Sequence, residues 1–361
     1  MQRFQSIHYL RAVAALMVVV LHLHTGTDFM HDRVSAIAWL EGGVDIFFII
    51  SGFVMVKSTA GNTILPQDFF IRRCQRIVPL YWLATLIMMT AIPGEFLFKL
   101  GSMFFLPMAN PHSGLLVPVV EPGWTLNYEM FFYLLFALSL LLAEKWRFWA
   151  LAGTLISLAT VSLILQPDGI LGFYTNPIML EFLLGMAIAK FGLKGPILLI
   201  PIGFAAMYFL YPQASSRLVS LGIPAALIII GAVGIEHKMR SYRVLNVLGD
   251  ASYSIYVFHL LVLGILIKNW DQMRVDQAYF APVAVIFVIV TAVALHWFLE
   301  RPIIAFFARR NAQSEVRCAN TADSIINRQA NNAAFNIEKV SAIADAPNSS
   351  GSSAISTTTS A

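Results

Sequence analysis

The sequence predicts an all-α integral membrane protein with about ten transmembrane helices and both termini in the cytoplasm. Of the 361 residues, 58% are hydrophobic and only 12% are charged, whereas a soluble domain carries roughly 25% charged residues. The apolar residues form solid runs close to the roughly 20 residues that cross a bilayer as a helix. A transmembrane β-barrel would instead show short alternating segments.

Each predicted helix is an apolar run bounded by charged, glycine or proline residues. The first run contains Arg11 and two histidines and lacks a clear cleavage site for a signal peptide, so we expect it to remain as a helix. Residues 97–107 are apolar but too short to cross, and we expect a re-entrant or interfacial segment there. The ten predicted helices span residues 6–24, 42–58, 77–92, 124–143, 148–165, 178–191, 196–211, 217–235, 252–268 and 280–300.

The segments between these helices carry their basic residues unevenly. With the N-terminus inside, the inner segments hold sixteen lysines and arginines, and the outer segments hold only five, among them Arg217. An excess of positive charge on the inner side is the usual sign of orientation in membrane proteins. It supports an even number of helices, because one helix more or fewer would place later basic segments outside.

Composition also divides the chain and excludes some functions. Residues 1–310 form the predicted membrane domain, and residues 311–361, rich in Ser, Asn, Ala and Thr, are expected to form a disordered cytoplasmic tail. The net charge of +4 does not indicate a nucleic-acid partner, because the basic residues punctuate apolar runs. Two cysteines are too few for a cysteine-based metal site, and we expect no metal.

Ionisable side chains inside a membrane are costly unless paired or hydrated, so each is a candidate functional residue. Arg11 and His22 are eleven positions apart, on one face of the first helix and about 16 Å from each other. Arg11 is equally well explained as a charge that anchors the helix at the cytoplasmic side, and His22 as an interfacial histidine. Asp45, at the start of the second helix, lies at roughly the height of His22. It either orients His22 as a general base or caps its own helix.

Further polar residues lie in the second, fourth and ninth helices. Glu129 lies past the first turn of its helix among apolar and aromatic residues, so we favour a functional role over a cap. Trp124 is explained as a residue of the membrane interface or as a stacking surface for a sugar. His259 is explained as a core histidine or as a site residue. Ser51 and Gly52 are expected to permit close helix packing rather than chemistry.

Arg72, Arg73 and Arg76 form a basic cluster between the second and third predicted helices. Arg73 and Arg76 are three positions apart and share a helical face. The cluster is explained as a charge anchor on the inner side, or as a phosphate clamp, because guanidinium groups bind phosphate oxygens through paired hydrogen bonds. The sequence has no Gly-rich phosphate loop, so a nucleotide would have to be held by such arginines.

Five segments, in this order, resemble the acyltransferase-3 family of integral membrane O-acyltransferases, and in particular its exopolysaccharide-production acetyltransferases. The arginine-to-histidine spacing of the first helix and the Arg-x-x-Arg pattern match family motifs, whereas His8 replaces the usual Asp or Asn. The resemblance covers about residues 6–302. The segments are Ile7 to Ala12 with His22, Gly43 to Phe53, Arg73 to Trp82, Trp124 to Tyr133, and Ser252 to His259.

The resemblance implies transfer of an acyl group, most often acetyl, from cytoplasmic acyl-CoA to a hydroxyl of an exported or cell-surface polysaccharide or its lipid-linked precursor. It also implies a multi-pass protein of the bacterial inner membrane. On this basis we expect Arg11, Arg73 and Arg76 to hold acetyl-CoA as the acyl donor. The alternative is a polytopic transporter or glycan flippase, but the sequence has no internal repeat and no matched pair of broken helices.

The resemblance also assigns roles to the remaining candidates. We expect His22, oriented by Asp45 or Glu129, to take the proton from the acceptor hydroxyl as that hydroxyl attacks the thioester. We expect Trp124 and His259 to contact the acceptor.

Overall fold

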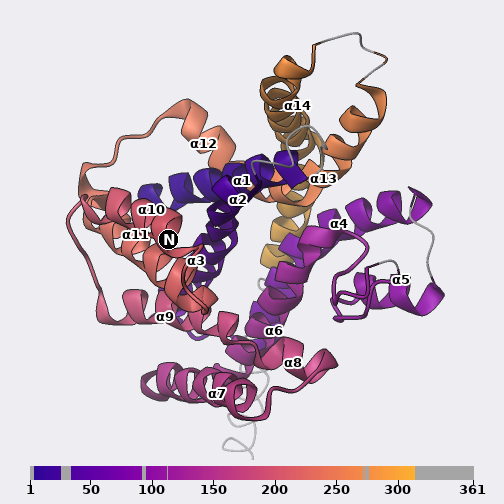
Figure 1. The fold of residues 1–361 in the computed structure, drawn as a ribbon. Helices are drawn as coiled ribbons and strands as arrows, with labels where there is room; N and C mark the ends of the chain where they lie inside the picture. Colours follow the sequence, from indigo (N-terminus) through magenta and orange to yellow (C-terminus); the bar gives the residue numbers. More distant parts are fainter. Residues whose placement is uncertain are drawn as a thin grey trace, which may run out of the picture. The chain divides into compact units, whose positions relative to one another are not determined.

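The computed structural model describes residues 4–25, 34–91, 95–111, 113–270, 272 and 276–313. Most of these residues lie in helices, and none of them lies in a strand (Figure 1). The chain divides into two units, Met1–Ile304 and Ala305–Ala361. The first unit carries every site residue discussed below. The predicted tail lies outside the described residues except for its first three, which are helical.

Five helices of the first unit carry the candidate site residues, and a sixth, α9, packs against one of them. They are α1 (Gln5–Thr25), α3 (Gly42–Thr59), α4 (Pro66–Ala91), α6 (Trp124–Ser139), α9 (Leu180–Phe191) and α13 (Ser252–Asn269). The other α-helices are α2 (Val34–Ile37), α5 (Phe96–Met103), α7 (Glu144–Leu165), α8 (Gly169–Thr175), α10 (Leu199–Leu210), α11 (Ile223–Gly234), α12 (Arg243–Asp250) and α14 (Phe280–Leu295). Two π-helical segments, η5 (Leu218–Gly222) and η9 (His296–Glu300), precede α11 and follow α14.

The described residues contain six helices that are long and apolar enough to cross a membrane. They are Gln5–Leu23, Ala38–Thr59, Glu144–Leu165, Gly169–Phe191, Ser252–Asn269 and the helix that begins at Phe280. Two further predicted spans are shorter apolar helices, α10 and Leu218–Gly234. The chain is therefore an all-helical, multi-pass membrane protein. The number of ten crossings and the cytoplasmic position of both termini stay predictions.

The third predicted helix begins earlier than the sequence indicated. Helix α4 starts at Pro66 rather than at residue 77. Proline suits the first turn of a helix, because a backbone N–H there would have no partner within the helix. Asp68 in the same turn interacts favourably with the helix dipole. The basic cluster therefore lies on a helix and not in a segment between helices, because its charges lowered the local hydropathy without ending the helical structure.

Helices α3 and α9 cross with their backbones almost in contact. A Cβ atom added to Gly52 would lie 2.1 Å from the carbonyl oxygen of Phe182, and one added to Gly185 would lie 2.0 Å from that of Ile49. Only glycine allows this approach, as the sequence predicted for Gly52. The crossing also brings Phe182 into a stack with the ring of Phe48, at a centroid distance of 4.6 Å.

The crossing generates a stability prediction. Gly185→Ala places a methyl group against the backbone of α3, and overpacking of this kind costs about 1–3 kcal/mol. We expect a lower midpoint of thermal unfolding for the purified protein in detergent. Gly153→Ala in α7 is the matched control, because nothing lies within 4 Å of the added Cβ. Equal midpoints for both variants would contradict the close crossing.

Candidate active site

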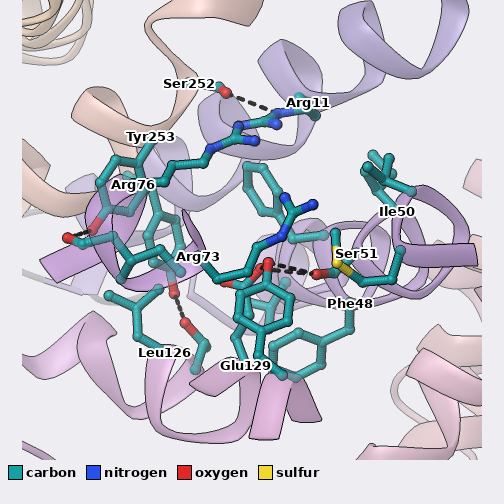
Figure 2. Close-up of a pocket in the computed structure, with 18 residues that line it drawn as sticks. Arg11, Phe48, Ile50, Ser51, Arg73, Arg76, Leu126, Glu129, Ser252 and Tyr253 are labelled. Atoms are coloured by element: carbon teal, nitrogen blue, oxygen red, sulfur yellow. Dashed lines mark hydrogen bonds between the residues drawn. The ribbon is translucent and has the colours of Figure 1, made fainter. Parts of the chain in front are cut away.

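A pocket lies between α1, α3, α4, α6 and α13 (Figure 2). Helix α3 supplies most of its apolar wall, and the other helices supply most of its polar groups. A pocket that combines apolar walls with a few convergent polar groups is the usual form of a small-molecule site. The polar lining residues are Arg11, Ser51, Arg73, Arg76, Thr125, Glu129, Tyr133, Ser252, Tyr253 and Tyr256.

The three arginines predicted to hold the donor converge on this pocket. Arg11 comes from α1, and its Nε donates to Oγ of Ser252 at 3.2 Å. Arg73 and Arg76 come from α4. The guanidinium carbon of Arg73 lies 5.8 Å from the ring centroid of Tyr133, and its Nε is buried without a hydrogen-bond partner among the described residues. The fold thus concentrates positive charge on one cavity wall.

Glu129 lies on the same pocket and is bound by two hydroxyl groups. Oγ of Ser51 donates to Oε1 of Glu129 at 2.9 Å, and the hydroxyl of Tyr133 donates to the same oxygen. The oxygens of Ser51 and Tyr133 are 3.0 Å apart. Figure 2 shows the side chain of Arg73 beside this group. Helices α3 and α6 together therefore hold a carboxylate against two hydroxyls and an arginine.

His22 and His259 face each other from α1 and α13. Nε2 of His259 lies 3.3 Å from Nδ1 of His22. Nδ1 of His22 lies 2.8 Å from the carbonyl oxygen of Val18, and Nδ1 of His259 lies 2.7 Å from that of Tyr256. Because a carbonyl oxygen can only accept, each Nδ1 carries the proton and each Nε2 is an acceptor. His22 therefore has the tautomer that a general base needs.

Asp45 does not orient His22, contrary to the expectation from helix height. Both of its carboxylate oxygens accept from Arg217, Oδ1 from Nε at 3.2 Å and Oδ2 from Nη2 at 2.7 Å. Arg217 also donates to Glu41 at 2.7 Å. The other expected partner, Glu129, accepts from hydroxyl groups instead. The residue that the structure places beside His22 is His259, which is fully buried.

Trp124 lies next to the ion pair of Asp45 rather than on the pocket wall. The guanidinium carbon of Arg217 is 6.0 Å from the centroid of the Trp124 ring, and the ring packs edge-on against Tyr128. Its contact with a sugar stays a prediction. The sequence did not indicate the role of Arg217, because a single arginine in an outer segment was informative only about the orientation of the chain in the membrane.

Comparison with known proteins identifies the class. Residues 4–301 match the family model described as an acyltransferase domain. The chain therefore belongs to the acyltransferase-3 family and is a membrane-bound O-acyltransferase.

Two relatives show similarity along the chain. Exopolysaccharide production protein ExoZ of Rhizobium meliloti (strain 1021) is 34% identical over 282 residues, which are 73% of this chain and 89% of the relative. Nodulation protein 10 of Rhizobium leguminosarum bv. viciae is 30% identical over 173 residues, 41% of this chain and 46% of the relative. No solved structure matches the chain.

The ion pair of Asp45 yields a second stability prediction. Arg217→Gln removes the cation from a fully buried carboxylate, and breaking a buried pair in this way costs about 3–5 kcal/mol. We expect a large fall in the midpoint of thermal unfolding in detergent. Arg240→Gln, at an exposed position, is the matched control. A wild-type midpoint for Arg217→Gln would mean that Asp45 does not need this partner.

Proposed function

We propose that this chain transfers an acetyl group from acetyl-CoA to a hydroxyl of an exported polysaccharide, or of its lipid-linked precursor, at the bacterial inner membrane. The observation that carries the proposal is the convergence of Arg11, Arg73, Arg76 and Glu129 on one pocket of a membrane-bound acyltransferase. Similarity to an exopolysaccharide production protein supports a polysaccharide acceptor.

The pocket suits an acyl-CoA donor in charge and polarity. In the described part of the chain, three cationic side chains and one acidic side chain line it, so it attracts the phosphates of CoA. Guanidinium groups bind phosphate oxygens through paired hydrogen bonds. The apolar wall of α3 offers a path for the uncharged pantetheine arm. The reactive thioester would then lie deeper in the pocket, near Glu129.

His22 is the proposed general base for the acceptor. Its Nδ1–H faces the carbonyl oxygen of Val18 and Nε2 of His259, and in this tautomer Nε2 of His22 is the nitrogen that can take up the hydroxyl proton. When His22 takes that proton, it becomes an imidazolium. Nε2 of His259 stabilises this cation by accepting a hydrogen bond from Nδ1–H of His22. His259 thereby acts as a positioning residue, in place of the predicted Asp45 or Glu129.

The arginine clamp can be tested by binding. We expect Arg73→Ala combined with Arg76→Ala to weaken acetyl-CoA binding about 10²- to 10⁴-fold, because hydrogen bonds to charged groups contribute about 1.5–3 kcal/mol each. Isothermal titration calorimetry in nanodiscs measures the affinity. Arg72→Ala is the control, since Arg72 is exposed and is not one of the residues that line the pocket. Unchanged affinity in the double variant would contradict the clamp.

The reaction itself can be tested with purified protein, radiolabelled acetyl-CoA and a lipid-linked oligosaccharide fraction. We expect label in the glycan, and we expect His22→Ala to lower its rate of appearance by about 10²–10⁴, the range for general-base help. His237→Ala, at an exposed position, should transfer at the wild-type rate. Absence of both acetyl-CoA binding and transfer in the wild type would favour a transporter instead.

A further inference from the structure

Ser51 and Glu129 line the donor pocket, whereas neither His22 nor His259 is one of the residues that line it in the described part of the chain. We propose that the donor first acylates Oγ of Ser51, with Glu129 as proton acceptor, and that the acyl group passes to the acceptor from this serine ester. The inference rests on the proposed function, because it takes acetyl-CoA as the donor in this pocket.

The hydrogen bond of Ser51 differs from that of other hydroxyl residues in the same helix. Helical serines and threonines usually donate to a carbonyl one turn earlier, as Ser58 and Thr59 do to the carbonyl oxygen of Met55, at 3.0 and 2.9 Å. Ser51 instead donates to a carboxylate of another helix at 2.9 Å. A hydroxyl held against a carboxylate in a pocket has the arrangement of an activated nucleophile.

The neighbouring arginine supplies the second requirement of acyl transfer. Negative charge grows on the thioester oxygen as the nucleophile attacks, and a preorganised donor that faces this oxygen lowers the barrier. Nε of Arg73 is buried and has no partner among the described residues, although its guanidinium lies near the ring of Tyr133. A buried donor without a hydrogen bond is destabilising, and a ligand oxygen that accepts from it would relieve this cost.

The steps balance as follows. Oγ of Ser51 bonds to the thioester carbon, its proton moves to Glu129, and the carbon–sulfur bond breaks to release the CoA thiolate, which takes a proton from water. The acceptor hydroxyl then attacks the serine ester while its proton moves to His22. The bond between the carbonyl carbon and Oγ breaks, Ser51 regains its proton from Glu129, and His22 releases its proton to water.

The test uses the full chain in nanodiscs with radiolabelled acetyl-CoA and no acceptor. We expect acetyl on Ser51 by peptide mapping, stable to neutral hydroxylamine as an oxygen ester, with release of an equivalent amount of CoA thiol. Ser51→Ala should carry no such label and should transfer to glycan at least 100-fold more slowly. Ser58→Ala, two turns along the same helix, is the matched control and should be labelled like the wild type.

Ser51→Cys separates a chemical role from a packing role. We expect this variant to carry label that neutral hydroxylamine removes, because a thioester has replaced the oxygen ester. Label on Tyr133 or on a native cysteine, or glycan transfer by Ser51→Ala at the wild-type rate, would overturn the assignment. So would glycan transfer by a wild-type protein that carries no label. In each of these cases wild-type transfer from acetyl-CoA to glycan persists, so the proposed function stands while the serine intermediate fails.

Discussion

The contact between the backbones of α3 and α9 at Gly52 and Gly185 sets the geometry of the pocket between α1, α3, α4, α6 and α13. It fixes the depth and rotation of α3, and so the direction of Ser51. It also brings Phe182 against Phe48 on α3 and Phe132 on α6, with the Phe132 and Phe182 ring centroids 4.3 Å apart. Lipid gives no hydrophobic drive for helix association, so packing of this closeness has to hold the helices together.

Once α6 is held by that aromatic stack, Glu129 reaches the pocket one turn from Phe132. Glu129 has two hydroxyl partners. One is Ser51, which lies on α3, and the other is Tyr133, which lies on α6 itself. A shift of α3 against α6 by one ångström would break one of these bonds and keep the other. The hydrogen bonds of this carboxylate therefore depend on the packing of α3 against α6.

The arginines of the membrane domain fall into two kinds. Arg217 has both carboxylate oxygens of Asp45 and one of Glu41 as partners, so its charge is neutralised within the protein and joins two helical segments. Arg73 and Arg76 line a pocket in which Glu129 is the only acidic side chain among the described lining residues. The acidic side chains among the described residues of this pocket do not balance its positive charge. An anionic ligand would supply the missing negative charge.

Much of the pocket, though not the role of Arg217, could be predicted from the sequence. The cost of burying a charge in an apolar helix indicated Arg11 and Glu129, and the resemblance to a family motif indicated Arg73 and Arg76; the fold brings all four to one pocket. The all-helical membrane fold followed from composition for the same reason. The early start of α4 was hidden, because its first turns are polar.

The pairing of Asp45 with His22 was wrong for a physical reason. Position along a helix gives the height of a side chain in the membrane, but the direction that it faces depends on helix rotation, which tertiary packing sets. Arg217 is 172 positions from Asp45, so nothing local indicated it. Ser51 was missed because a serine beside a glycine in an apolar helix is fully explained by close packing.

The histidine pair and the pocket are mechanically connected through Tyr256. Its side chain lines the pocket, its hydroxyl donates to the carbonyl oxygen of Pro122 at 2.9 Å, and its own carbonyl oxygen accepts from His259. The start of α6 and the tautomer of His259 thus depend on one residue of α13. Since His259 in turn contacts His22, the proposed base for the acceptor is positioned by the wall of the cavity that we propose as the donor site.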